Sequence, residues 1–273
     1  MRRFSSVVWA VSLFSGAGVV SANQINVAVL SAIGNTGFTN NAVTSIQNGS
    51  SFLNVSWIDV YSLAPPDLLT LDNYAAVMVV SNLGFQNPAG LGDVLKSYVD
   101  QGHGVVIAEY TNSTTQGPNT ELAGGFAASD YWAIEPGPTT SNPNLTLGIV
   151  HVANSPLLNN VHTLNGGTGA AYVNSTVNAA ATDVIDWSNG LPLVATRTIG
   201  SGTVVGLNMY PPNNQAWSGL WLSTGDGGKL MADALLYAGG YSQDSGSSIP
   251  EGGTLMLSGV GLAAFSLVLK RRA

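Results

Sequence analysis

Short apolar runs alternate with helix-like segments between residues 25 and 110, and this alternation is the feature that most limits the possible folds. The runs are rich in Val, Ile and Ala, which is typical of buried strands. They are Ile25–Leu30, Phe52–Val60, Ala75–Val80 and Gly104–Ala108. Helices are predicted between them over Thr39–Gln47 and Pro88–Asp100. Such alternation predicts one α/β domain with a mostly parallel sheet flanked by helices.

The second half of the chain predicts more strands and a closing helix. The polar stretch from Tyr110 to Asn144 is the least regular, and a short helix is predicted there within Thr120–Ser129. Strands are predicted at Leu145–Val152, Ala170–Val173, Thr182–Asp186, Leu193–Arg197 and Thr203–Asn208. The last helix is predicted over Asp226–Ala238, with Asp226 as its capping residue.

Several of these segments resemble class I glutamine amidotransferase-like domains. They are Gly190–Ala195, Ile199–Leu207, Asp226–Leu230 with Asp233–Tyr237, and the turn His151–Leu157. The resemblance covers about residues 25–239 and implies a flavodoxin-like sheet. In catalytic members a cysteine lies on a sharp turn after a central strand. Here Val105–Ala108 runs into Glu109–Ser113, and the chain contains no cysteine, so a cysteine-dependent glutaminase or hydrolase is excluded.

The first residues have the layout of a secretory signal peptide. Arg2 and Arg3 precede an apolar run over Val7–Val20, and Val20-Ser21-Ala22 offers the small residues that signal peptidase requires. We therefore expect cleavage after Ala22. The alternative is a first transmembrane helix that is kept, but the run is short for a membrane span.

The last residues have a matching three-part layout. After a Gly/Ser-rich linker come Pro250 and Glu251, then an apolar run over Thr254–Leu269, then Lys270, Arg271 and Arg272. This tail resembles a PEP-CTERM sorting signal, which implies a bacterial source and processing by an exosortase. Gly252 departs from the family pattern, which usually has a second proline there, so a plain membrane anchor and a sortase signal stay open.

These patterns divide the chain into four parts. We expect a signal peptide over residues 1–22, an amidotransferase-like domain over 23–239, a linker over 240–249, and a sorting signal with a short transmembrane helix over 250–273. The expected location is the cell envelope, the cell surface or the extracellular space. The expected partners are signal peptidase, an exosortase-like enzyme, the membrane before processing, and an extracellular polysaccharide.

The charge of the body disfavours nucleic acid as a partner. Residues 23–249 contain three basic residues against fourteen of the fifteen acidic ones in the chain. Nucleic-acid binding depends on clustered Lys and Arg that neutralise phosphates. Three scattered cations cannot supply that attraction, so we expect no nucleic-acid partner.

If a ligand binds, the edge at the carboxyl ends of the parallel strands is the expected place. The candidate rim residues there are Ser31, Gly34, Asn82, Glu109, Tyr110, Asn208 and Tyr210. Glu109 directly follows an apolar strand, so burial there would raise its pKa. A structural acid held by a backbone amide is the more common outcome for such a residue.

No pattern predicts a catalytic residue, a metal ligand set or a cofactor. Ser113 with His151 or His162 as base is conceivable, but the chain has no Gly-x-Ser-x-Gly motif. Asp183 and Asp186 could take part in a calcium site, although solvated carboxylates at a loop end are the expected state. The sequence therefore predicts neither a metal site nor a cofactor.

The leading hypothesis is an exported protein of the envelope or extracellular matrix, whose amidotransferase-like domain has a non-catalytic binding or structural role. One alternative is a secreted hydrolase of polysaccharide or ester that uses the rim near Glu109. A second alternative is a carbohydrate-binding module in which Trp217 and Trp221 form an exposed stacking surface. Packing of these two rings in the core or a loop is the competing expectation.

Overall fold

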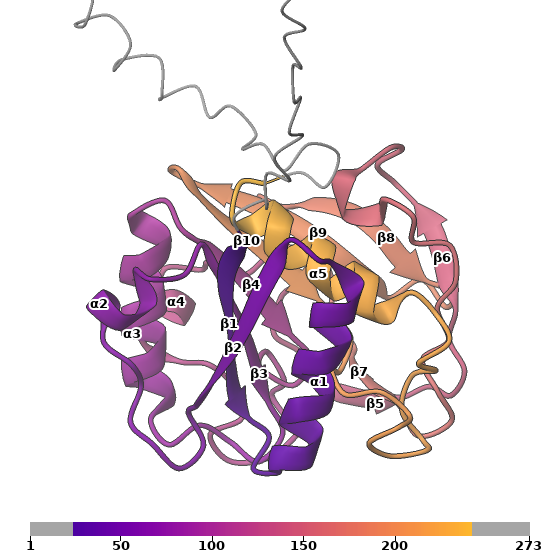
Figure 1. Ribbon diagram of the computed structural model, residues 1–273, viewed down its shortest axis with the longest axis horizontal. Helices are drawn as coiled ribbons and strands as arrows, with labels where there is room; N and C mark the ends of the chain where they lie inside the picture. Colours follow the sequence, from indigo (N-terminus) through magenta and orange to yellow (C-terminus); the bar gives the residue numbers. More distant parts are fainter. Residues whose placement is uncertain (1–23, 242–273) are drawn as a thin grey trace, which may run out of the picture.

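The computed structural model describes residues 24–241, which form an eight-stranded sheet with helices on both faces (Figure 1). The strand order is β2-β1-β3-β4-β10-β9-β8-β6. The elements of the first half are β1 Ile25–Ala32, α1 Thr36–Gly49, β2 Leu53–Asp59, α2 Leu68–Leu71, β3 Ala76–Ser81, α3 Pro88–Asp100, β4 Gly104–Ala108 and α4 Gly124–Ala128. Those of the second half are β5 Thr139–Ser141, β6 Leu147–Val150, the 3-10 helix Pro156–Leu158, β7 Ala171–Val173, β8 Thr182–Trp187, β9 Pro192–Ile199, β10 Gly202–Leu207 and α5 Gly227–Ala238.

Five neighbouring strands, β2-β1-β3-β4-β10, are parallel and have the strand order of flavodoxin-like folds. All residues of β3 and β4 are buried, which explains their continuous apolar sequences. Successive residues of β1 belong to opposite cores, since Val27 and Val29 lie in one apolar cluster and Ala28 and Leu30 in the other.

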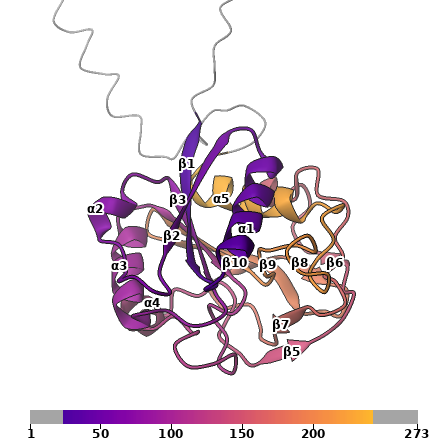
Figure 2. The same ribbon diagram turned by 60° about the horizontal axis from the view of Figure 1, so that its bottom comes forward.

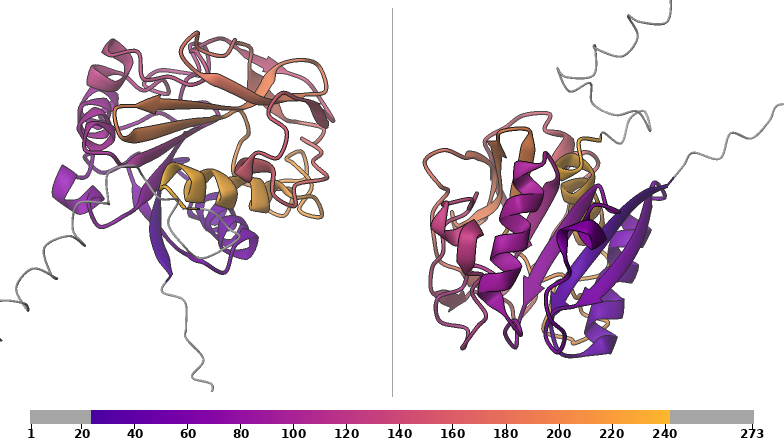
Figure 3. Two further views of the ribbon diagram at one scale, coloured as in Figure 1. Left: turned by 90° about the horizontal axis from the view of Figure 1, so that it is seen from above. Right: turned by 90° about the vertical axis from the view of Figure 1, so that its left-hand side faces the viewer.

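The helices form two layers around the parallel strands (Figure 3). Helices α1 and α5 pack together on one face, while α3 packs with α2 and α4 on the other. Helix α1 begins where Asn35 accepts hydrogen bonds from the amides of Gly37 and Phe38. Helix α3 begins in the same way at Asn87, with Pro88 in the first turn.

The other half of the sheet is antiparallel. Strands β9 and β10 form a hairpin whose turn contains Gly200 at φ +59°, and β8 and β6 continue outward from β9 as antiparallel neighbours. Strands β5 and β7 form a separate two-stranded sheet. Four of the seven neighbouring strand pairs in the large sheet are parallel. The prediction of a mostly parallel α/β sheet flanked by helices is thus confirmed.

Most predicted elements are found, with α3 and β4 at the predicted bounds. The sequence interpretation missed α2, β5 and the 3-10 helix, which are three or four residues long. Asp226 occupies the N-cap position of α5, as predicted, but its side chain forms no hydrogen bond with the first turn of the helix. Its carboxylate instead accepts hydrogen bonds from the backbone amides of His162 and Thr163, at 2.8 and 2.7 Å.

The two ends of the described chain lie at the amino edge of the sheet. Gln24 directly precedes β1, and the end of α5 lies against the starts of β3 and β4, where a Cβ on Gly104 would come within 2.2 Å of the Ala238 carbonyl oxygen. Within residues 24–241, no helix is long and apolar enough to cross a membrane. The predicted cleavage site at Ala22, the linker, and the tail with Pro250, Glu251, Lys270, Arg271 and Arg272 lie outside the described residues, apart from the linker's first two positions.

Candidate functional site

The predicted rim lies at the carboxyl edge of the parallel strands, which faces the reader in Figure 2. Ser31 is the second-to-last residue of β1, Asn82 follows β3, Glu109 follows β4, and Asn208 follows β10. The structure therefore places the predicted residues at one edge. Their exposure differs widely, and this difference decides what each one can do.

The chain turns sharply directly after β4. Tyr110 has φ +68°, in the left-handed region that only a few per cent of non-glycine residues occupy. Its ring lies 5.3 Å from that of Tyr210, centroid to centroid. In catalytic domains of the class I glutamine amidotransferase type, the nucleophilic cysteine is expected on the turn that corresponds to this one. Here a half-buried tyrosine occupies it.

Glu109 is a buried acid, with only 1% of its surface exposed. Burial raises the pKa of its carboxyl group well above the usual range, while hydrogen bonds from the Tyr210 amide and the Tyr110 hydroxyl act in the opposite direction. Its Oε1 atom has no hydrogen-bond partner. A buried carboxyl group without a cation beside it is most stable in its neutral, protonated form.

Three tyrosines lie near enough to Glu109 to be affected by its charge. Burial, and then the Glu109 charge, raise the pKa of Tyr110, Tyr172 and Tyr210. The Tyr172 hydroxyl is buried without a partner, and the Tyr210 hydroxyl faces the Asn82 side chain without hydrogen-bonding geometry. Because Glu109, Tyr172 and Tyr210 are buried, a polymer cannot reach the acid without displacing the rings.

Asn208 has a structural role at this edge. It is 3% exposed, and its side chain bridges two strands. Its Oδ1 atom accepts from the Val173 amide at 2.9 Å, and its Nδ2 atom donates to the carbonyls of Val173 and Pro192 at 2.9 and 3.0 Å. The Asn208 side chain therefore joins β7 to β9. Both N–H groups of its amide are used in these hydrogen bonds, so they are not free to bind a ligand.

The more open part of the rim lies beside β1. A pocket of about 240 Å³ is lined by Ser31, Gly34, Asp59 and Tyr61, among others. Ser31 itself is 3% exposed, and its hydroxyl lies 2.9 Å from that of Thr39. Among the five pockets described here, this is the one that includes predicted rim residues. It is small for a polymer.

Ser113 does not form part of a catalytic pair. It is 1% exposed; its Oγ atom accepts hydrogen bonds from the amides of Thr115 and Gln116, and lies 2.5 Å from the Thr139 hydroxyl. These hydrogen bonds are typical of a serine that stabilises a polar turn.

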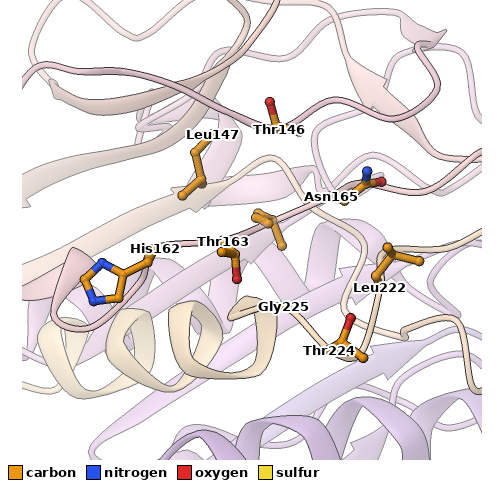
Figure 4. Close-up of a pocket in the computed structure, with 9 residues that line it drawn as sticks. Thr146, Leu147, His162, Thr163, Asn165, Leu222, Thr224 and Gly225 are labelled. Carbon is orange, nitrogen blue, oxygen red and sulfur yellow. The ribbon is translucent and has the colours of Figure 1, made fainter.

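His162 lines a pocket of about 480 Å³ on the β6 side of the molecule (Figure 4). The other lining residues are apolar or neutral and polar, and include Leu147, Thr163, Asn165 and Leu222. No carboxylate lines this pocket beside His162. An acid–base pair for hydrolysis is therefore missing among its lining residues.

A groove lined mainly by polar side chains runs along α1. It consists of two adjoining pockets of about 410 and 460 Å³, which share Asn41, Thr44 and Gln215. We call it the α1 groove. It starts at the carboxyl edge beside Asn35, because α1 begins there, and extends along the helix to Asn48.

Exposed polar side chains form one wall of the α1 groove. Asn40, Thr44 and Asn48 are spaced four residues apart, so they project from the same face of α1. At the base, Asn213 and Asn41 are joined by two hydrogen bonds, of 2.8 and 3.1 Å. The base is thus fixed, while amide and hydroxyl groups of the wall face solvent.

The charges beside the groove are already paired. Lys229 and Asp226 line the pocket of about 410 Å³. The Lys229 ammonium lies 2.5 and 2.6 Å from the carboxylate oxygens of Asp233, and the Asp226 carboxylate accepts two backbone amides of the 162–163 segment. Neutral hydrogen-bonding groups therefore dominate what the groove offers.

The expected pair of exposed tryptophans is not present. Trp221 is 3% exposed, and its Nε1 atom donates to the Pro211 carbonyl at 3.1 Å. Trp217 is 51% exposed, and its ring covers Gly169 and Gly219 closely enough that a Cβ on either would overlap it. The prediction of a stacking surface made of both rings is thus wrong, but Trp217 alone presents an exposed aromatic surface, and it follows Gln215 and Ala216 of the groove in the chain.

Two features of this edge were missed in the sequence interpretation. The first is the position of β7: Tyr172 was predicted as part of a strand, but nothing in the local sequence shows that this strand lies beside Asn208 at the end of β10. The second is the polar face of α1, which had a signal: Asn40 and Thr44 within the predicted helix, and Asn48 directly after it, are poor helix formers spaced four residues apart. Exposure to a ligand is one reason for such a pattern.

The sheet order, the turn after β4 and the helices on both faces give this chain the fold of class I glutamine amidotransferase-like domains. No family model matches the sequence, and no curated protein matches it. The fold assignment therefore depends on the structure and not on sequence similarity.

Solved structures with the same fold are available. A cytoplasmic protein of Salmonella typhimurium aligns with a TM-score of 0.59 at 13% identity, over 78% of this chain and 98% of that one. ThuA-like proteins of Parabacteroides merdae and Bacteroides uniformis align with TM-scores of 0.58, at 14% and 13% identity, over 84% of this chain and 94% and 96% of theirs. At such low identity, the similarity establishes the fold alone.

Proposed function

We propose that this protein is exported to the cell envelope or extracellular matrix, is sorted through its C-terminal tail, and uses its amidotransferase-like domain to bind a neutral polysaccharide without catalysis. The observation that carries the non-catalytic part is Tyr110 on the turn after β4. Where this class needs a nucleophile, the chain has a tyrosine whose hydroxyl bonds to a buried acid.

The burial of Glu109 argues against the hydrolase alternative. A general acid or base must reach the substrate within hydrogen-bond distance, directly or through one water molecule. Glu109 is 1% exposed, and its carboxyl group is held by the Tyr210 amide and the Tyr110 hydroxyl. A binding role needs no such access, because its contacts are made on the surface.

Export is supported by the two ends of the sequence. The apolar run before Ala22 and the Pro250-Glu251 tail with its terminal Arg cluster have the layout of a secretory leader and a sorting signal. The body ends at the amino edge of the sheet, opposite the α1 groove's start at the carboxyl edge. A tail fixed to the envelope would therefore leave that opening of the groove directed away from the attachment point.

The α1 groove supports a neutral, polyhydroxylated ligand. Amides and hydroxyls both donate and accept hydrogen bonds, as sugar hydroxyls do. The nearby charges of Asp226 and Lys229 are engaged by other protein groups, so nothing there favours an ionic ligand. Trp217, which is half-exposed and follows Gln215 and Ala216 of the groove in the chain, offers a flat apolar surface of the kind on which sugar rings pack.

Groove variants should lose retention on neutral polysaccharide. We expect the double variant Thr44→Ala/Asn48→Ala to weaken retention of the full chain on insoluble neutral glucan about tenfold or more, since two hydrogen bonds contribute about 1–3 kcal/mol in total and tenfold corresponds to about 1.4 kcal/mol. Trp217→Ala should weaken it by a similar factor. The measurement is depletion of the protein from solution by increasing amounts of glucan.

The matched control is Asn73→Ala, an exposed asparagine next to α2 on the opposite face of the sheet. It should bind as well as the unchanged protein. Equal retention of the groove variants and this control would overturn the proposed groove. Release of soluble sugar by the unchanged protein would instead support the hydrolase alternative.

A further inference from the structure

A second polar cluster lies at the outer edge of the sheet, away from the α1 groove. It contains His151, which follows β6, and Asp183 and Asp186 of β8. The His151 Nε2 atom lies 2.8 Å from Asp186 Oδ2 and 3.4 Å from Asp183 Oδ2. One candidate ligand atom from each of the three residues lies within 4.8 Å of the other two.

Irregular strand pairing brings the two carboxylates together. In a regular strand, residues three apart point to opposite faces of the sheet. The pairing of β8 with β9 shifts between Asp183 and Ile185 and again between Ile185 and Asp186. As a result Val184, Ile185 and Trp187 all lie in one apolar cluster, which leaves both aspartates directed away from it.

A second irregularity positions the histidine. The backbone amides of His151 and Val152 both donate to the Val184 carbonyl oxygen, at 2.9 and 3.3 Å. Two amides on one carbonyl are the pattern of a classic β-bulge, and bulges redirect side chains, often beside functional sites. The His151 ring thereby lies over the carboxylates. The expectation of solvated carboxylates at a loop end is wrong, because Asp186 is 7% exposed within β8.

The cluster has excess negative charge and an unused ligand atom. The Oδ1 atom of Asp183 is buried and has no hydrogen-bond partner. The three Lys and Arg residues within 24–241 form ion pairs elsewhere, with Asp100, Asp130 and Asp233. No Lys or Arg of the described chain therefore balances Asp183 and Asp186, and His151 is the one ionisable group of opposite sign beside them.

The donor set fits a divalent transition metal. One imidazole nitrogen with two carboxylate oxygens suits Zn²⁺ or Mn²⁺, whereas Ca²⁺ prefers six to eight oxygen ligands. Ligands about 2.1 Å from a tetrahedral Zn²⁺ lie about 3.4 Å apart. The distance from His151 Nε2 to Asp183 Oδ2 is 3.4 Å and already fits. The distance from His151 Nε2 to Asp186 Oδ2 is 2.8 Å and would have to increase slightly. We propose that His151, Asp183 and Asp186 bind one Zn²⁺ or Mn²⁺ ion at this edge of the sheet.

The proposal is tested by titrating the metal-free full chain with ZnCl2 and MnCl2 in a calorimeter, and by the melting temperature with and without metal. We expect one ion per chain, a higher melting temperature with metal, and at least tenfold weaker binding for His151→Ala and for Asp186→Asn. Asp183→Asn, at a more exposed residue, gives a second test if Asp186→Asn fails to fold. His103→Ala is the matched control, since His103 lies 3.7 Å from a single carboxylate, that of Asp72.

Three results would overturn the proposal. The first is no heat of binding with either metal. The second is a loss in His103→Ala as large as in His151→Ala. The third is Ca²⁺ binding that depends on the two aspartates but not on His151, because that would indicate an oxygen-only site.

Discussion

Asn208→Ala should destabilise the fold by about 3–5 kcal/mol, the largest loss of stability expected from one side chain at this edge. The change leaves the Val173 amide and the carbonyls of Val173 and Pro192 without their partners inside the protein. Each buried group that loses its hydrogen bond costs about 1–3 kcal/mol. Urea unfolding followed by circular dichroism measures the difference.

Asn54→Ala is the matched control for this loss. Asn54 also uses its amide for a hydrogen bond, to Asn26 at 2.9 Å, but both residues are exposed. Water replaces that bond, so we expect a change within about 0.5 kcal/mol. If Asn208→Ala costs no more than Asn54→Ala, Asn208 does not hold β7 and β9 together as described.

Glu109→Gln should stabilise the protein at neutral pH, and the gain should disappear in acid. Burial raises the pKa of Glu109 in the folded state above its unfolded value. The folded state therefore binds the proton more tightly, so stability is complete below the unfolded pKa and falls as the pH rises towards the folded pKa. In that interval the free energy of unfolding falls by up to about 1.4 kcal/mol per pH unit. Because glutamine carries no charge, the variant does not lose stability in this way as the pH rises.

The measurement is the free energy of unfolding of both proteins in urea at several pH values between 4 and 8. Glu121→Gln serves as a graded control, because partial burial raises the pKa of Glu121 in the same direction. Its gain should be smaller. A Glu109→Gln protein that is less stable than the unchanged one at pH 7 would mean that the folded state holds Glu109 ionised.

The parallel half of the fold was predictable because each of its elements has a local signal. Strands β3 and β4 are continuous apolar runs, and Asn87-Pro88 is a strong helix start. The antiparallel half was predicted as strands without their direction, since direction depends on which strand pairs with which. Among the short elements, α2, β5 and the 3-10 helix were missed because three or four residues have no measurable periodicity, whereas β6 and β7 lie in apolar stretches that were predicted as strands.

The site was less predictable, because it depends on contacts between distant segments. The sequence placed Glu109 at the strand end and anticipated its burial. It could not show that the Asn208 side chain is fully engaged by backbone groups 16 and 35 residues away. The bulges that bring Asp183 and Asp186 beside His151 likewise arise from strand pairing, which spacing along one strand does not reveal.

The central claim is that an exported, non-catalytic binding domain is delivered by its tail. The most direct test is the intact mass and cell fractionation of the native protein, beside a variant with Pro250→Ala and Glu251→Ala. We predict that the native chain is cut near Ala22 and near Pro250 and leaves the membrane, whereas the variant keeps its tail and stays there. A native chain that keeps both ends and remains in the cytoplasm would contradict the account.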